Sequence, residues 1–266
     1  MAPRIPETVQ PILENYVAGW NEQMPDLCSG WYIVGSIALG EFNEYYSDID
    51  FVTVLNHRMT PLEIEKLWAM HQNLEKTFPR WKMSGSYIQP GDLGKLNGTI
   101  EPHPHYHDGI LHVDVRNELN AVTWWELKHH GIAVIGMDTR HLVFDVDWDI
   151  LITTIRENLN SYWADWASQP ARMILLYSDW GIQWAITGVL RQFYTFRENT
   201  ITTKSKAAEY ALGCLPRRWH PLIQEAINIR NRKKGSVYRL KMFRAWDAIR
   251  FLRFIIQTCN ANDTQR

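Results

Sequence analysis

Two aspartates, Asp48 and Asp50, are one residue apart in a stretch that is otherwise apolar. Residues 49–55 have the composition of a half-buried strand, in which residues i and i+2 project from the same face. The two carboxylates would then lie about 6–7 Å apart along the backbone. Buried carboxylates repel each other and are costly to desolvate unless a cation or hydrogen bonds compensate. The pattern therefore predicts paired oxygen ligands for a hard cation such as Mg²⁺.

A glycine and a serine, Gly35 and Ser36, precede this pair and follow a predicted strand at about 31–35. Eleven residues, 37–47, separate them from Asp48. Glycine lets a ligand approach the backbone closely, and serine adds a hydroxyl donor. This combination indicates nucleotidyl transfer, with Mg²⁺ on the two aspartates bridging a triphosphate. The alternative is a structural or vestigial form of the motif. The sequence contains neither GxxxxGK[ST] nor GxGxxG, which disfavours P-loop and Rossmann sites.

The elements that must position these residues form two patterns along the chain. Up to about residue 144, predicted strands and helices are mixed. Helices are expected at 6–24, 60–77 and 122–130, strands at 84–89, 110–115 and 132–136, and a Gly/Pro/His-rich loop at 90–109. From residue 145 the apolar spacing becomes helical throughout. We predict an α+β protein with one domain at 1–144 and a helical bundle at 145–266.

The composition, 45% hydrophobic and 21% charged over 266 residues, is typical of a folded globular protein. No apolar run approaches the ~20 residues of a membrane span, and no secretory signal is evident. The three cysteines are odd in number and far apart, which suits a reducing compartment. The sequence therefore predicts a cytoplasmic protein without a membrane partner.

Charge is unevenly distributed along the chain. Residues 1–190 contain 12 Lys and Arg against 24 Asp and Glu, whereas residues 191–253 contain 15 against 4. One interpretation is an ordinary solvated surface. The other is an acidic part that holds metal or a cationic substrate and a basic part that holds a polyanion.

The stretch YIVGSIALGEFNEYYSDIDFVTVL, residues 32–55, resembles the nucleotidyltransferase superfamily related to DNA polymerase beta. The later segments NAVTWWELKHHGIAVIG, WAITGVLRQFYTF and ITTKSKAAEYALGCLPRRWHPLIQEAINIR resemble the streptomycin/spectinomycin adenylyltransferases. Together the resemblance spans most of the chain. It implies a polymerase beta-like nucleotidyltransferase domain followed by a helical domain, with ATP and the drug bound between them.

The resemblance also implies roles for individual residues. Asp48 and Asp50 match the catalytic metal ligands, and the nucleotide contacts match Gly35, Ser36, Ser47, Arg191, Lys204 and Arg230. At Arg230 the family has a tyrosine, so the residue type differs there. The last three positions lie in the basic part of the chain; each could instead be a solvated or carboxylate-paired cation.

One position departs from the family in a way that affects the chemistry. The family has a carboxylate, the general base, on the strand after the first long helix, and this chain has Ser84 there. An alcohol is too weak a base to take a proton near neutral pH. Another carboxylate could act, or water, or activity could be impaired. The carboxylates considered are Glu101, Asp108, Asp114, Glu126 and Asp179.

Four histidines, at positions 103, 105, 107 and 112, have spacing that suggests zinc only weakly, since no cysteine or HExxH helix accompanies them. A polar loop near the cleft is the favoured interpretation. The segment at 230–241, RNRKKGSVYRLK, could bind RNA or form a solvated basic loop between helices.

The expected activity is Mg²⁺-dependent adenylyl transfer from ATP to a hydroxyl of an aminoglycoside-type antibiotic, with release of pyrophosphate. ATP and a cationic small molecule would be its partners, and nucleic acid is disfavoured. The alternatives are a catalytically impaired nucleotide-binding homologue, or a nucleotidyltransferase that acts on a protein or RNA.

Overall fold

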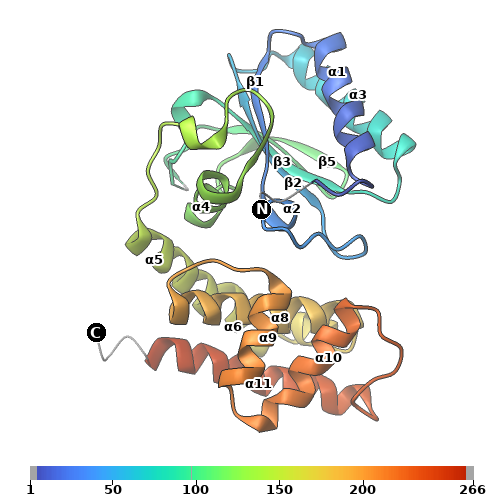
Figure 1. The fold of residues 1–266 in the computed structure, drawn as a ribbon, viewed down its shortest axis with the longest axis vertical. Helices are drawn as coiled ribbons and strands as arrows, with labels where there is room; N and C mark the ends of the chain where they lie inside the picture. Colours follow the sequence, from blue (N-terminus) through green and yellow to red (C-terminus); the bar gives the residue numbers. More distant parts are fainter. Residues whose placement is uncertain (1–4, 97, 262–266) are drawn as a thin grey trace. The chain divides into compact units, whose positions relative to one another are not determined.

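The computed structural model describes residues 5–96 and 98–261, which divide into two units at Leu151 (Figure 1). The first unit is mixed α and β and the second is helical, so the predicted α+β class is confirmed. The division falls inside helix α5 (Trp148–Asn158), a few residues after the predicted boundary at 144/145.

A six-stranded sheet is the frame of the first unit. Its strands are β1 (Cys28–Ile33), β2 (Ile49–Leu55), β3 (Met83–Ile88), β4 (His103–His107), β5 (Ile110–Val115) and β6 (Ile132–Ile135). Their spatial order is β5-β4-β3-β2-β1-β6, and only the β2–β3 pair is parallel. Because parallel strands need a crossover, helix α3 (Pro61–Thr77) connects β2 to β3.

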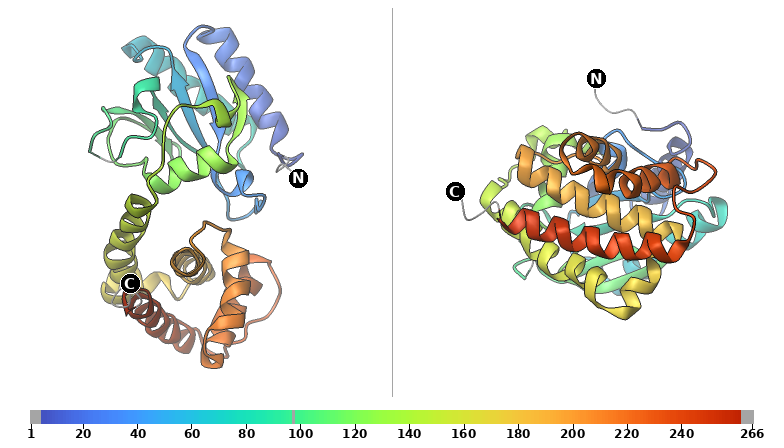
Figure 2. Two further views of the ribbon diagram at one scale, coloured as in Figure 1. Left: turned by 60° about the vertical axis from the view of Figure 1, so that its left-hand side comes forward. Right: turned by 90° about the horizontal axis from the view of Figure 1, so that it is seen from below.

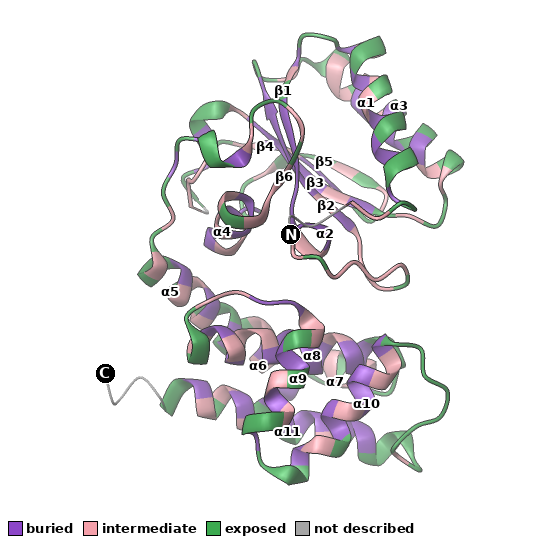
Figure 3. Cartoon of the chain, viewed as in Figure 1, coloured by how far each residue is buried: buried purple, intermediate pink, exposed green. Residues whose placement is uncertain are grey.

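The two faces of the sheet carry different cores. On one face, α1 (Gln10–Gln23) and α3 pack over Trp31, Phe51 and Tyr87. The other face carries a smaller core that includes Val52 and Trp124 of α4 (Ala121–His130). Figure 3 shows β2 and β3 largely buried between these layers and the outer sides of α1 and α3 exposed.

Helix α3 begins where the sequence signals are strongest. Thr60 and Glu63 form a capping box, and Pro61 stands at the first helical position. Leu67, Met70 and Leu74 are buried on one side of this helix, as the helix expected at 60–77 requires for packing against a core. After this helix the start of β3 lies beside the start of β2, with Met83 opposite Ile49.

The predicted loop at 90–109 is wrong for residues 103–107, which form β4. Alternating histidines there follow the period of a strand, but Pro104 argues against one. Pro104 is accommodated where the β4–β5 register is irregular, between His103 and His105. The remaining elements of this unit are the short helix α2 (Gly35–Ala38) and the 3₁₀ turns η1 (Pro90–Asp92) and η2 (Thr139–His141).

The second unit consists of helices around a shared core, which includes buried residues of α8 (Asp179–Glu198) and of the last helix. Helix α5 is followed by a π turn η3 (Leu159–Trp163), α6 (Ala164–Ser168) and α7 (Pro170–Leu175). Helix α8 is followed by α9 (Lys204–Cys214), the turn η4 (Arg217–Trp219), α10 (His220–Arg230) and α11 (Lys241–Ala261). Figure 2 shows α8 and α11 side by side. Within the described ranges, no helix has the length and apolarity needed to cross a membrane.

Candidate functional site

The two aspartates lie at the start of β2, where the core on one face of the sheet ends. Asp50 is the second residue of β2, and Asp48 immediately precedes the strand. Ile49 and Phe51 are buried against α1 and α3, so Asp50 projects from the opposite face. Both aspartates are half-buried. The two carboxylates therefore lie at the start of β2, an interior strand of the sheet.

Gly35 passes directly against the Asp50 carboxylate. The Val34 amide donates to the Asp50 carbonyl at 2.9 Å, which fixes the end of β1 beside the start of β2. Gly35 then has φ +63°, and a Cβ added to it would overlap Asp50 Oδ2. Only glycine satisfies both conditions without strain.

Two serines flank these residues. Ser36 Oγ is buried and has no hydrogen-bond partner among the described residues. A buried hydroxyl without a partner is unfavourable, so this atom suits a bound acceptor such as a phosphate oxygen. Ser47 Oγ accepts a hydrogen bond from the Asn43 backbone amide at 3.1 Å, which anchors the loop before Asp48. Because a hydroxyl can donate as well as accept, Ser47 can still donate a hydrogen bond to a ligand.

Ser84 is the register partner of Asp50 in the parallel β2–β3 pair. Ser84 Oγ lies 3.1 Å from His107 Nδ1 of β4, and His107 Nε2 lies 3.3 Å from Asp108 Oδ2. Lys82 Nζ donates to Asp108 Oδ1 at 2.9 Å. This bond lowers the pKa of Asp108 and raises the pKa of Lys82. The negative charge of Asp48 raises the pKa of Lys82 further.

The position of His107 beside Ser84 is not predicted from the sequence, because His107 lies in the segment 90–109, which is predicted to form a loop. The alternation His103, His105, His107 was the signal available for a strand. Among the described residues, no group of three or more His, Cys, Asp or Glu side chains is arranged to hold a metal ion. Asp48 and Asp50 form a pair, which fits Mg²⁺ held by one or two carboxylates together with substrate phosphates.

The other carboxylates considered as a base lie in different surroundings. Glu101 pairs with Arg58 at 3.2 Å, Glu126 is buried on α4, and Asp114 is exposed on β5. In the second unit, Asp179 pairs with Arg244 at 2.7 Å.

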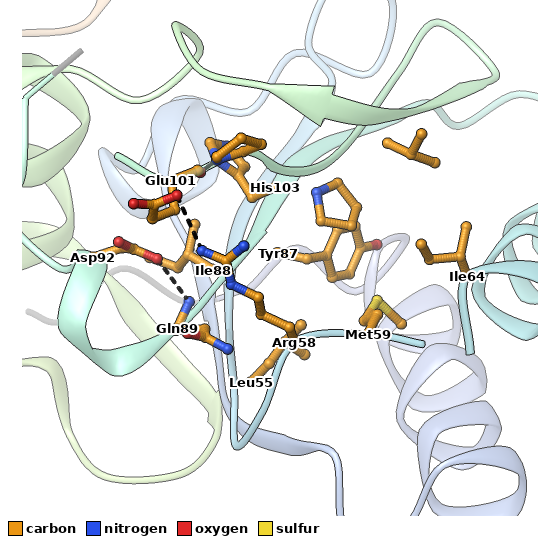
Figure 4. A pocket seen from close by; sticks show the side chains of 13 residues that line it. Leu55, Arg58, Met59, Ile64, Tyr87, Ile88, Gln89, Asp92, Glu101 and His103 are labelled. Carbon is orange, nitrogen blue, oxygen red and sulfur yellow. Dashed lines mark hydrogen bonds and ion pairs between the residues drawn. The ribbon is translucent and has the colours of Figure 1, made fainter. Parts of the chain in front are cut away.

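A small pocket lies at the far end of β2 and β3, beside the Arg58–Glu101 pair (Figure 4). Leu55 lines it, five residues along β2 from Asp50, which corresponds to about 17 Å. Its volume of about 160 Å³ is below the ~300 Å³ of a typical ligand site. The pocket is therefore separate from Asp48 and Asp50 and too small for a nucleotide.

The three predicted basic residues belong to the second unit. Arg191 is half-buried on α8. Lys204 begins α9, and its Nζ lies 4.1 Å from the centre of the Trp184 ring. Arg230 ends α10, is buried, and donates to Gln183 Oε1 at 3.4 Å. Their contacts with a nucleotide stay a prediction.

Comparison with known families gives a match in each unit. Residues 28–81 match the model of the nucleotidyltransferase domain, and this region contains Gly35, Ser36, Ser47 and both aspartates. Residues 141–242 match the model of the C-terminal domain of aminoglycoside adenylyltransferase, which includes the three basic residues. A search of curated protein sequences gave no match.

A solved structure shares the fold. The crystal structure of spectinomycin adenyltransferase AAD(9) from Enterococcus faecialis with ATP and spectinomycin superposes with a TM-score of 0.66. The match covers 93% of this chain and 99% of that chain, at 14% sequence identity. At this identity the likeness concerns the fold alone.

Proposed function

We propose that this chain, an aminoglycoside adenylyltransferase-like nucleotidyltransferase by its two domain families, transfers the adenylyl group of ATP to a hydroxyl of an aminoglycoside-type antibiotic. The observation that carries the proposal is the packing of Gly35 against the Asp50 carboxylate, with the buried Ser36 hydroxyl next in the chain. A glycine turn and a hydroxyl donor beside a carboxylate pair suit a triphosphate and its cation.

Asp48 and Asp50 would hold Mg²⁺, which when bound neutralises charge on the phosphate oxygens. The Ser36 hydroxyl would donate a hydrogen bond to a phosphate oxygen. The Ser47 hydroxyl would donate another from the anchored loop before Asp48. The substrate oxygen attacks the α-phosphorus, and pyrophosphate leaves. The chain's part is to orient the nucleotide so that the attacking oxygen and the leaving group are in line.

Arg191, Lys204 and Arg230 would supply positive charge to the triphosphate. The support is their position in the basic stretch 191–253, where 15 Lys and Arg outnumber 4 Asp and Glu. The excess of acidic residues in 1–190 suits a polycationic acceptor. AAD(9), with the same fold, was crystallised with ATP and spectinomycin, so spectinomycin is the first acceptor to test. Streptomycin, which the sequence resemblance implies, is the second.

The proposal is tested by mass spectrometry of each drug after incubation with the protein, ATP and Mg²⁺. The expected result is a product that carries one added adenylyl group and forms only when all three components are present. Unmodified drug across a full panel of aminoglycosides would contradict the proposal.

A second candidate function, nucleotide binding without efficient turnover, is favoured by Ser84 at the position beside Asp50. Binding of ATP and Mg²⁺ measured by calorimetry, together with the drug assay, separates the two functions. An impaired homologue binds ATP and Mg²⁺ yet modifies no drug. No comparable observation favours RNA. Residues 231–240 form an exposed loop between α10 and α11, held where Val237 N donates to the buried Glu225 at 2.7 Å.

A further inference from the structure

Asp50, Ser84 and His107 stand on three adjacent strands of the sheet. Ser84 is opposite Asp50 in the β2–β3 register, and the pairs Gly85–Tyr106 and Ser86–His105 place His107 opposite Ser84. Since neighbouring strands are about 4.8 Å apart, Ser84 is the side-chain position next to Asp50 on β3. The hydrogen bond between Ser84 Oγ and His107 Nδ1 then extends the row to β4.

The second ring nitrogen of His107 faces a carboxylate. Asp108 and Gly109 both have positive φ, 47° and 78°, as the two-residue turn of the β4–β5 hairpin requires. This turn holds Asp108 Oδ2 3.3 Å from His107 Nε2. A carboxylate there favours the tautomer with the proton on Nε2, so Nδ1 is left to accept the hydroxyl proton of Ser84.

The same pairing occurs two residues deeper in the sheet, where its surroundings differ. Ser86 Oγ lies 2.8 Å from His105 Nδ1, and both residues are buried, with 1% and 9% of their surface exposed. By contrast, half of the His107 side chain is exposed. The inner pair is thus confined to the core, whereas the outer pair is open to a substrate and adjoins Asp50.

We propose that Ser84 and His107 together remove the proton of the acceptor hydroxyl, in the place where a carboxylate would otherwise serve. This inference rests on the proposed adenylyl transfer, which needs a proton acceptor because the attacking oxygen loses its hydrogen. Serine alone is too weak a base, and the imidazole behind it supplies the basicity.

In this step the acceptor O–H gives its proton to Ser84 Oγ, and Ser84 gives its own proton to His107 Nδ1. The acceptor oxygen forms a bond to the α-phosphorus, while the bond from that phosphorus to the bridging oxygen of pyrophosphate breaks. The resulting imidazolium is stabilised by Asp108, and its proton returns to water. Ser84 is the catalytic residue that touches the substrate, and His107 is the base that acts through it.

The test is steady-state kinetics with spectinomycin and streptomycin as acceptors, using Ser84→Ala, His107→Gln and the double variant. We expect each single variant to lower kcat by about 10²–10⁴-fold, with the KM for ATP nearly unchanged. The double variant should lose no more than either single variant, because the two residues act as a unit. His112→Gln, which replaces an exposed histidine on β5, is the matched control and should keep the wild-type kcat.

Rescue separates chemistry from a structural role. In Ser84→Asp/His107→Gln a carboxylate at position 84 can take the proton directly, so kcat should rise at least ~10-fold above that of His107→Gln. Thermal unfolding of every variant shows whether it is folded. The inference would be overturned by a folded His107→Gln with the wild-type kcat. It would also be overturned if the kcat of Ser84→Asp/His107→Gln did not exceed that of His107→Gln. Either result leaves the proposed function standing. A wild type that modifies no drug contradicts the proposed function itself, and the inference falls with it.

Discussion

The backbone of Gly35 lies against the carboxylate of Asp50, so closely that a Cβ at position 35 would overlap Oδ2. The hydrogen bond from Val34 N to Asp50 O holds the two chain segments together. The contact joins the glycine turn to Asp50, the residue that we propose as a metal ligand.

Gly35→Ala is expected to displace the Asp50 carboxylate and to strain a backbone with φ +63°. We predict a loss of adenylyl transfer of at least ~100-fold, since displacement by ~1 Å can cost that much. The measurement is the initial rate of product formation at saturating ATP. Gly213→Ala, in helix α9 with open space around the position, is the control and should be active. Equal rates for the two variants would contradict the role of Gly35.

Lys204→Ala should weaken ATP binding from the helical unit. Loss of a hydrogen bond to a charged group costs about 1.5–3 kcal/mol, which corresponds to a ~10–100-fold rise in the KM for ATP. We expect a smaller change in kcat, because the contact is made in the ground state as well as in the transition state.

The control for this variant is Lys206→Ala, which removes an exposed lysine two residues later on the same helix. A specific contact predicts that only Lys204→Ala shifts the KM. If both variants shift it equally, Lys204 contributes only general positive charge.

A buried histidine gives the first unit a pH-dependent stability. His71 Nε2 lies 3.1 Å from Tyr16 OH and 2.5 Å from Tyr87 OH, and burial lowers the pKa of His71 to about 3. The unfolded histidine has a pKa of about 6.5. Between these values the unfolded chain binds a proton that the folded chain does not, so the free energy of unfolding falls as the pH drops below about 6.5.

Urea unfolding at pH 7 and pH 5 measures this contribution. The wild type should lose about 2 kcal/mol more than His71→Phe between the two pH values. The substitution keeps a ring to stack on Tyr106, 3.6 Å from His71 between ring centroids, and other titrating groups cancel in the comparison. An identical pH dependence in both proteins would show that His71 is not held neutral by the fold.

The sequence predicted the carboxylate pair and its elements because their signals are local. The apolar residues around Asp48 and Asp50, and the glycine and serine before them, are signals that depend on neighbouring residues alone. The pairing of Ser84 with His107 joins residues 23 positions apart, and it depends on the register of β3 with β4. Pro104 argues against a strand there, and the alternation of the histidines does not give the register that places His107 beside Ser84.

The contact of Gly35 with Asp50 was likewise only partly predictable. Glycine before the aspartates indicated close approach of a ligand, whereas the atom that occupies the space beside Gly35 is the carboxylate itself. Such a contact arises because the end of β1 lies beside the start of β2, an arrangement that local composition does not specify.

Adenylyl transfer at Asp48 and Asp50 is best tested by measuring pyrophosphate release from ATP by the wild type and by Asp50→Asn. We predict release that requires Mg²⁺ and an aminoglycoside acceptor in the wild type, and none above background in a folded Asp50→Asn. Acceptor-dependent release that persists unchanged in Asp50→Asn would contradict it.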